Sequence, residues 1–156
     1  MIKVLFVCLG NICRSPLAEG VFRELVAGQG LAARIATDSC GTLGYHVGEA
    51  PDRRARAAAE ARGVEIGDLR ARTLAAGDFA AFDYVLAMDR GNRRDIEALR
   101  PLGSRAHVAL LLDYAPELGV REVPDPYYGG WEGFERVLDM VEAGARGLLA
   151  EIRRDL

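Results

Sequence analysis

The sequence predicts an α/β fold, a single-domain doubly wound four-stranded parallel sheet with helices on both faces. Two observations lead to this prediction. Short apolar runs typical of strands alternate along the chain with segments of helical periodicity. The length of 156 residues and the apolar content of 50% suit one core, and no repeat or linker divides the chain. We therefore expect residues 1–156 to form one domain with right-handed crossovers.

The first strand and first helix have the clearest signals. Residues 2–7 form a nearly continuous apolar run, as expected of a strand buried on both faces. A helix is predicted over 16–27, with Ser15 as a candidate N-cap and Pro16 at the first helical position. Apolar residues then recur at helical spacing, namely Leu17, Val21, Phe22 and Leu25.

The remaining elements continue the alternation. We expect strands over 35–39, 84–88 and 107–112, and helices over 52–61, 92–99 and 131–152. Residues 63–81 are predicted to be a loop with one helical turn. In such sheets a ligand binds beyond the carboxyl ends of the strands at the switch point, and the segment after the first strand falls there.

That segment carries a thiol, a glycine and a guanidinium within one strand-to-helix turn. It reads Cys8-Leu9-Gly10-Asn11-Ile12-Cys13-Arg14-Ser15-Pro16. A cysteine and an arginine six residues apart are a weak signal in a chain this rich in arginine. The preceding strand and the following helix make the signal much stronger.

A turn of this kind is suited to bind a phosphate without a metal ion. The N–H groups at a helix start and the helix dipole attract anions, and Gly10 and Asn11 tolerate the backbone conformations that curl the loop. Arg14 offers paired donors to two phosphate oxygens, and its charge favours the nucleophilic thiolate of Cys8. Ser15 can either cap the helix or face the sulfur, but not both.

The segment resembles the active-site loop of the low-molecular-weight protein tyrosine phosphatases. Near the other end of the chain, Asp125-Pro126-Tyr127-Tyr128-Gly129 resembles the acid loop of the same family. Looser landmarks lie between them in family order: Asp38-Ser39-Cys40-Gly41-Thr42, Tyr45-His46-Val47-Gly48, Arg70-Ala71-Arg72 and Val85-Leu86-Ala87-Met88-Asp89.

The resemblance implies hydrolysis of phosphotyrosine through a cysteinyl-phosphate intermediate, with no metal and no cofactor. Cys8 would be the nucleophile, and Arg14 with the loop from Leu9 to Ser15 would bind phosphate. Asp125 would be the general acid and then the general base, a role typically worth about 10²–10⁴-fold in rate. Phosphotyrosine-containing proteins or peptides would be the partners, and phosphate and vanadate would inhibit.

Aromatic residues are expected to form the walls of the pocket. Tyr127 and Tyr128 follow Asp125 directly, and the resemblance places Tyr45 on the opposite wall. Flat rings would create a slot that accepts an aryl phosphate and rejects short alkyl ones. In some family members the tyrosine pair is itself phosphorylated.

Four further residues complete the expectations. The resemblance implies that Ser39 and Arg72 support the loop, although Leu69 stands where many members have a histidine before the arginine pair. It also implies that Cys13 can form a reversible disulfide with Cys8. Cys40 departs from the small residue usual in the family.

Composition argues against several other classes. A net charge of −3 and a pI near 5.5 give no general attraction to nucleic acid or anionic membranes. Three cysteines, an odd number, favour a reducing cytoplasm, and no stretch is long and apolar enough for a secretory signal or a membrane span. His46 and His107 lack zinc-site spacing, so we expect no metal.

Three alternatives remain open from sequence. An arsenate reductase can share this loop, but it needs cysteines after Cys40 and there are none. A protein-arginine phosphatase uses a close variant of the loop with threonine at the position of Ile12, and the larger isoleucine favours phosphotyrosine. A non-catalytic phospho-ligand binding module would not need Cys8, Arg14 and Asp125 together.

Overall fold

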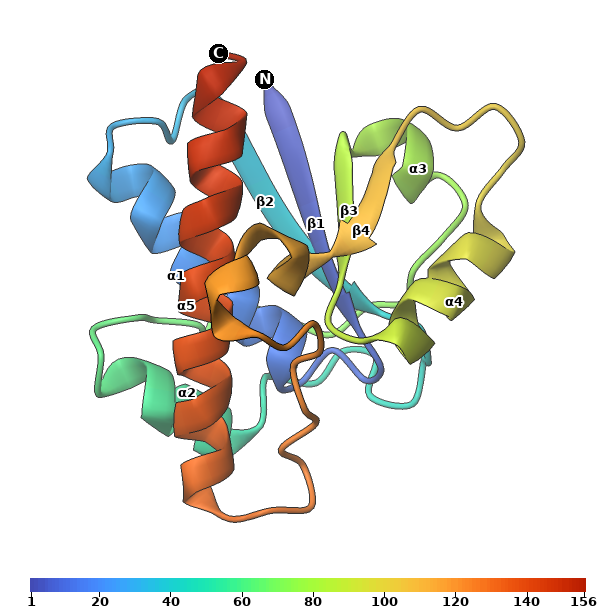
Figure 1. Ribbon diagram of the computed structural model, residues 1–156. Coiled ribbons are helices and arrows are strands. Elements are labelled where there is room, and N and C mark those ends of the chain that lie inside the picture. Colours follow the sequence, from blue (N-terminus) through green and yellow to red (C-terminus); the bar gives the residue numbers. More distant parts are fainter.

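A parallel sheet of four strands lies at the centre of the molecule (Figure 1). The computed structural model describes residues 1–156. The strands are β1 (Ile2–Cys8), β2 (Ile35–Gly41), β3 (Tyr84–Ala87) and β4 (His107–Leu110), in the spatial order β2-β1-β3-β4 with every pair parallel. The predicted α/β class and four-stranded parallel sheet are confirmed.

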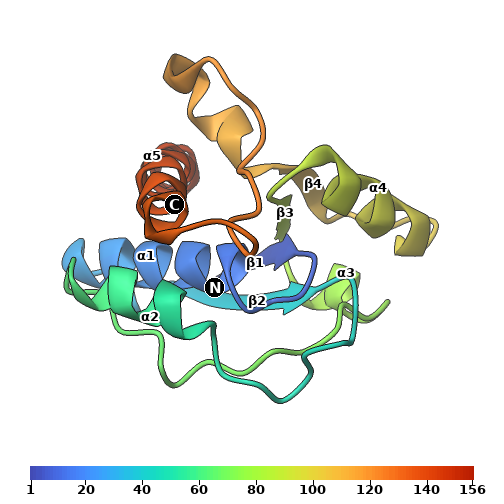
Figure 2. The same ribbon diagram turned by 90° about the horizontal axis from the view of Figure 1, so that it is seen from below.

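Helices cover both faces of this sheet (Figure 2). On one face lie α1 (Arg14–Gly28) and α5 (Trp131–Arg154), with α2 (Arg53–Glu60) beside α5. On the other lie α3 (Asp78–Ala81) and α4 (Arg90–Leu99). Short 3-10 turns over Leu111–Tyr114 and Pro116–Leu118 follow β4.

The central strand β1 contributes to two separate cores. Val4 and Phe6 belong to the larger cluster under α1 and α5, whereas Leu5 and Val7 belong to the smaller one under α3 and α4. All four side chains are fully buried. Each such side chain typically stabilises a fold by about 1.5–3 kcal/mol, so the strand that ends at Cys8 is firmly fixed.

Several predicted boundaries shift by one or two residues; α4, for example, begins at Arg90 and α5 ends at Arg154. The helix α1 begins at Arg14 and not at Pro16, so Ser15 is inside the helix and does not cap it. β4 ends at Leu110, because a 3-10 helix begins at Leu111. The strand was predicted to reach residue 112 because the apolar run continues to that point, and an apolar run does not distinguish a buried strand from a buried turn. β2 extends two residues further than predicted, to Gly41. The single helical turn expected within 63–81 is α3.

A glycine allows α5 to lie directly on the 3-10 turn after β4. A Cβ added at Gly147 would lie 1.8 Å from the carbonyl oxygen of Tyr114, closer than any real contact. Only glycine fits at such a backbone approach. The C-terminal helix is thereby held against the segment that leads from the sheet toward Asp125.

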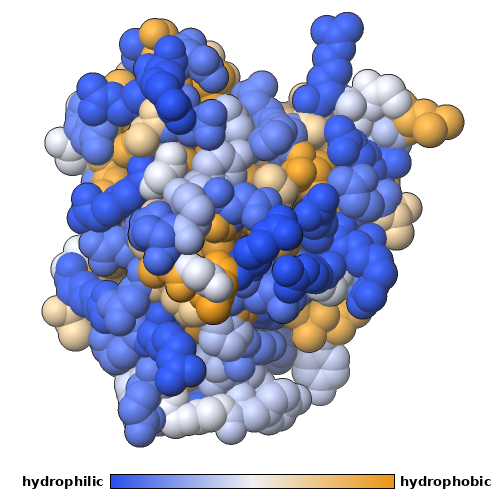
Figure 3. Space-filling model, viewed as in Figure 1, coloured by the Kyte–Doolittle hydropathy of each residue, from blue (hydrophilic) through white to orange (hydrophobic).

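Hydrophilic residues cover most of the face shown in Figure 3, with apolar residues gathered near its middle. No helix combines the length and hydropathy needed to cross a bilayer.

The strand order creates a switch point between β1 and β3. The chain leaves β1 toward β2 on one side and later leaves β3 toward β4 on the other. The segments that follow β1 and β3 therefore diverge at the carboxyl edge of the sheet and leave a crevice there. Cys8 ends β1, and Asp89 follows β3 as the N-cap of α4.

Candidate active site

In the loop after β1, carbonyl groups bond to neighbouring segments, whereas most of the amides have no partner in the protein. The carbonyls of Cys8, Leu9 and Ile12 accept hydrogen bonds from the N–H groups of Thr42, Leu43 and Asp52 at 3.0, 3.0 and 2.7 Å. The N–H groups of six residues donate to no protein acceptor, namely Leu9, Gly10, Ile12, Cys13, Arg14 and Ser15. Such a ring of free amides at a helix start is an anion site.

The approach of β2 to this loop requires a glycine. A Cβ added at Gly41 would lie 2.6 Å from the carbonyl oxygen of Leu9 and would push the loop out of place. The glycine thus lets the end of β2 support the loop from behind.

Asn11 holds the loop in its curled shape. It is the one non-glycine residue with positive φ, at 59°. Its side-chain amide donates to Ser15 Oγ at 2.7 Å and to Ser39 Oγ at 3.0 Å, and its Oδ1 accepts from the backbone N–H of Arg72 at 3.1 Å. These three bonds stabilise a conformation that an L-residue otherwise avoids.

The predicted support residues Ser39 and Arg72 therefore both contact Asn11. Arg72 does so through its main chain, whereas its guanidinium pairs with Asp38 at 3.0 Å and Asp78 at 3.1 Å. These two ion pairs anchor the segment whose N–H group reaches Asn11.

A buried acid behind Ser39 was not predicted from sequence. Ser39 Oγ donates to Glu19 Oε1 at 2.7 Å, and Glu19 is only 4% exposed. Burial raises the pKa of Glu19 to about 7, although the hydrogen bond from Ser39 works in the opposite direction. In sequence Glu19 is one helical residue among others, and nothing marks it as buried.

We expect the unfolding free energy of the Glu19→Gln variant, measured relative to that of the parent chain, to increase as the pH rises. The folded chain holds a proton on Glu19 up to about pH 7, whereas the unfolded chain releases it near its ordinary pKa of 4.5. The parent therefore loses unfolding free energy between these pH values, about 3 kcal/mol in total, and glutamine does not titrate. Urea unfolding of both proteins at pH 5 and pH 8 measures the difference. Parallel pH profiles would contradict the assignment.

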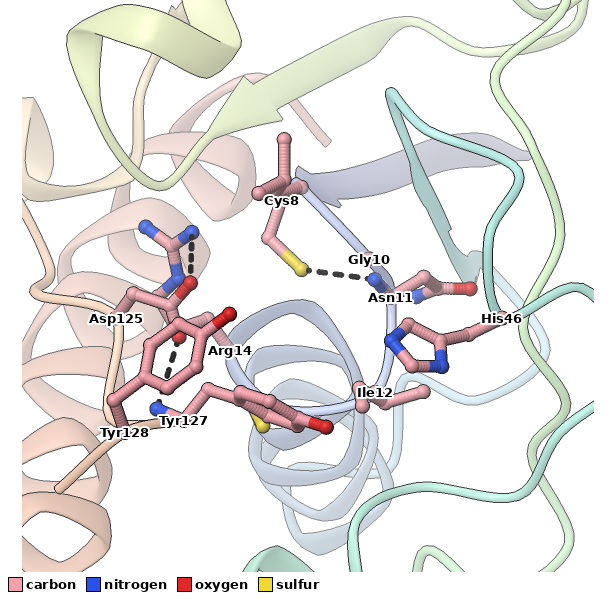
Figure 4. A pocket seen from close by; sticks show the side chains of 11 residues that line it. Cys8, Gly10, Asn11, Ile12, Arg14, His46, Asp125, Tyr127 and Tyr128 are labelled. Atoms are coloured by element: carbon pink, nitrogen blue, oxygen red, sulfur yellow. Dashed lines mark hydrogen bonds and ion pairs between the residues drawn. The ribbon is translucent and has the colours of Figure 1, made fainter.

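Cys8 lies at the bottom of the loop with two hydrogen-bonding neighbours. Its Sγ is 2.9 Å from Ser15 Oγ and accepts the backbone N–H of Asn11 at 3.3 Å (Figure 4). Because Ser15 does not cap the helix, its hydroxyl is free to face the sulfur. Burial raises the pKa of both Cys13 and Cys40, so these two thiols are protonated at neutral pH.

Arg14 reaches the pocket from the first turn of α1. Its Nη1 donates to Asp89 Oδ2 at 2.6 Å and to the carbonyl of Val123 at 3.1 Å, and its Nη2 is 3.5 Å from Asp125 Oδ2. Burial opposes its charge, but Cys8 and the two carboxylates raise its pKa on balance. Asp89 was not predicted as a site residue, although its position before a helix marks it as a cap.

One pocket brings together most of the predicted residues (Figure 4). It is lined by Cys8, Leu9, Gly10, Asn11, Ile12, Cys13, Arg14, His46, Asp125, Tyr127 and Tyr128. Asp125, 117 residues after Cys8 in the chain, is half-exposed at its mouth and accepts the N–H of Tyr127 at 3.1 Å. Ser15 lies behind Cys8 and supports the sulfur.

The prediction that Tyr45 lines the pocket is wrong. Tyr45 is 87% exposed and lies outside the pocket, with its ring edge 4.9 Å from the ring of His46. His46 is the wall residue, because its ring packs over Gly10 and its Nδ1 pairs with Glu49. Its ring centroid is 6.2 Å from that of Tyr127 on the opposite side. The sequence therefore predicted the neighbour of the residue that forms this wall.

Cysteine-dependent phosphatases typically combine an anion-binding loop, a buried thiol and an arginine that lies between carboxylates. The fold and the site of this protein together define that class. The sequence model of the family described as low molecular weight phosphotyrosine protein phosphatase matches residues 3–156. The chain therefore belongs to the low molecular weight protein tyrosine phosphatases, which are phosphoric monoester hydrolases.

Individual relatives agree with this assignment. The low molecular weight phosphotyrosine protein phosphatase of Schizosaccharomyces pombe is 52% identical over 134 residues, 85% of each chain. A solved protein tyrosine phosphatase from Entamoeba histolytica, with Hepes in its active site, is 37% identical with a TM-score of 0.95 and covers 99% of both chains. A solved Drosophila arginine phosphatase is 30% identical with a TM-score of 0.91, over 97% of this chain and 98% of its own.

Proposed function

We propose that the protein hydrolyses phosphotyrosine in proteins, and small aryl phosphates, through a cysteinyl-phosphate intermediate without a metal ion. The observation that carries the proposal is the convergence of Cys8, Arg14 and Asp125 on one cavity floored by free amides. In the first step the Cys8 thiolate attacks phosphorus in line and the P–O bond to the tyrosine breaks. Asp125 gives its proton to the departing phenolate.

The second step reverses the proton movement. Asp125, now a carboxylate, takes a proton from water, the hydroxide attacks phosphorus, and the S–P bond breaks to release phosphate and the Cys8 thiolate. The Ser15 hydroxyl at 2.9 Å stabilises that thiolate as a leaving group. Arg14 and the amides from Leu9 to Ser15 hold the equatorial oxygens in both steps.

The walls of the pocket favour an aromatic leaving group. The rings of His46 and Tyr127 line the pocket with their centroids 6.2 Å apart, and the ring centroid of Tyr128 lies 5.0 Å from that of Tyr127. A phenyl ring packs against such surfaces, and a short alkyl phosphate gains little from them. Ile12, which is almost fully buried in the loop, adds an apolar contact below the ring.

The decisive test compares phosphopeptides that differ only in the phosphorylated residue. Purified protein with a thiol reductant and EDTA is expected to release phosphate from phosphotyrosine peptide at least about 100-fold faster than from phosphoserine or phosphoarginine peptide. Phosphate and vanadate should inhibit competitively. Preference for phosphoarginine, which the name of the Drosophila arginine phosphatase indicates for that protein, would overturn the substrate assignment. Absence of turnover would overturn the enzyme mechanism.

Asp125→Asn is expected to slow substrates with poor leaving groups most. Asparagine keeps the size of the side chain but has no proton to give, so kcat/KM for phenyl phosphate should fall about 10²–10³-fold. Para-nitrophenolate leaves without such help, and its phosphate ester should lose far less. Glu122→Gln is the matched control, because it removes one charge from the same segment and contacts Arg90 outside the pocket. An equal loss for both esters would remove the acid role from Asp125.

We also infer a reducing cytoplasmic location and sensitivity to oxidation. Cys8, Cys13 and Cys40 are all buried free thiols, and Cys13 lines the same pocket as Cys8. Three predictions from the family resemblance stay predictions: reversible pairing of Cys8 with Cys13, a role for Cys40, and phosphorylation of the exposed Tyr128. The acidic net charge supports action without nucleic acid or membrane partners.

A further inference from the structure

The Asp125 loop has no regular secondary structure of its own, yet Asp125 must reach the leaving group. Residues 119–130 lie between the last 3-10 turn and α5. Their contacts with the rest of the protein include the Val123 N–H, which donates to the carbonyl of Met88, and the carbonyls of Tyr127 and Gly129. The group that donates hydrogen bonds to those two carbonyls therefore helps to set the position of Asp125.

Both carbonyls accept from one guanidinium, that of Arg54. Its Nη2 donates to the carbonyl of Tyr127 at 2.8 Å and its Nη1 to the carbonyl of Gly129 at 3.0 Å. The same group lies over the rings of Tyr127, at 5.8 Å, and Phe134, at 4.8 Å. Arginine thus contacts the loop on its main chain and on the ring that lines the pocket.

Arg54 is itself fixed by its neighbour Asp52. The carboxylate of Asp52 accepts from Arg54 Nε and Nη2, both at 3.1 Å, and also caps α2 by accepting the Arg54 N–H at 2.8 Å. Burial works against the charge of Asp52, but the hydrogen bonds from Arg54 hold its pKa below the usual range. The pair is therefore ionised at neutral pH.

Asp52 also contacts the phosphate-binding loop. Its backbone N–H donates to the carbonyl of Ile12 at 2.7 Å. A continuous path of hydrogen bonds therefore runs from Ile12 through Asp52 and Arg54 to Tyr127 and Gly129. It joins the loop that binds the phosphate to the loop that carries the acid, although these loops lie more than 100 residues apart in the chain.

We propose that Arg54, oriented by Asp52, is a positioning residue that sets the Asp125 loop at the correct distance from the Cys8 loop for proton donation. Arg54 does not line the pocket; it acts through the Asp125 loop. The catalytic part of this inference rests on the proposed function, whereas the ordering of residues 125–130 by Arg54 does not.

The test compares Arg54→Met with Arg53→Met. Both replace an arginine in the first turn of α2 and remove one positive charge, but Arg53 is exposed and makes no ion pair or hydrogen bond through its side chain. Arg54→Met should lower kcat/KM for phenyl phosphate about 10- to 100-fold and for para-nitrophenyl phosphate much less, and Arg53→Met should change neither. Arg54→Lys should recover only part of the loss, because lysine cannot reach both carbonyls and Asp52.

Asp52→Asn tests whether Asp52 orients Arg54, since asparagine still caps α2 but does not form the ion pair. It should lower kcat/KM for phenyl phosphate more than for para-nitrophenyl phosphate, but by less than Arg54→Met does. In an Asp125→Asn background, Arg54→Met should add no further loss for phenyl phosphate, because the positioned proton is already gone. Additive losses, or equal losses for both esters, would overturn the positioning role.

Hydrogen exchange separates this inference from the enzyme mechanism. Arg54→Met should speed amide exchange over residues 125–130, where the Tyr127 N–H donates to Asp125, while Arg53→Met should not. If the parent chain cleaves no aryl phosphate, the proposed function fails and the exchange result still decides whether Arg54 orders the loop. Unchanged exchange in Arg54→Met would overturn the inference on its own.

Discussion

Cys8→Ser is expected to abolish turnover while leaving the fold and phosphate binding in place. A serine hydroxyl does not ionise at neutral pH and is a far weaker nucleophile than a thiolate, so kcat should fall by at least about 10⁴-fold. The site around it is unchanged, because six free amides and Arg14 supply the contacts to phosphate. Phosphate release from a phosphotyrosine peptide measures the loss, and calorimetry with the same peptide measures binding.

The matched control for Cys8→Ser is Cys13→Ser. Cys13 lines the same pocket, but its raised pKa keeps its thiol protonated, and the proposed reaction does not use it. Its variant should keep turnover within about tenfold of the parent, and thermal melting of both variants should show a folded protein. A Cys8→Ser protein that retained more than about a hundredth of the activity would rule out the cysteinyl-phosphate intermediate.

Arg14→Lys is expected to cost about 10³-fold in kcat/KM, the range found when one donor to a transition-state oxyanion is lost. Arg14 is 2% exposed, and its guanidinium contacts Asp89, Val123 and Asp125 at once. A lysine ammonium is a single point of charge and cannot both hold Asp89 and present two parallel donors to phosphate. Steady-state kinetics with para-nitrophenyl phosphate measures the effect, since that ester does not depend on the general acid.

Two comparisons interpret the Arg14 result. Arg23→Lys changes another α1 arginine, one that contacts Asp68 and the carbonyl of Glu65 near the surface, and it should leave kcat/KM unchanged. Asp89→Asn keeps the cap of α4 through its single amide oxygen but turns an NH2 group toward Arg14, so a loss of at least about tenfold is expected from the missing charge and the missing hydrogen bond. If Arg14→Lys were as active as Arg23→Lys, paired donation to phosphate would have no part in the reaction.

The predicted residues that the structure brings together in one pocket are mainly those with local signals in the sequence. The Cys8 loop lies between an apolar strand and a helical periodicity, so its neighbours in sequence fix its conformation, and the Asp-Pro motif marks Asp125. Asp89 and Glu19 were missed because their contacts with Arg14 and Ser39 span 75 and 20 residues and arise only when strands and helices pack. Arg54 was missed for the same reason, with partners 73 and 75 residues away.

The errors in the predicted elements also have physical causes. Tyr45 and His46 are adjacent in a segment without regular structure, where no periodicity decides which of them faces inward. The run from Val108 to Leu112 is apolar throughout, so the change from strand to 3-10 helix at Leu111 depends on packing against α5 and not on composition.

The curled backbone at Asn11 has a consequence for the entropy of ligand binding. A loop that ordered itself only around phosphate would lose about 1–2 kcal/mol of conformational freedom for each residue fixed. Here the side-chain amide of Asn11 bonds to Ser15 and Ser39, and its Oδ1 accepts the N–H of Arg72, so contacts within the protein bear part of that cost. We therefore expect the free energy of phosphate binding to reflect desolvation and charge more than the freezing of the chain.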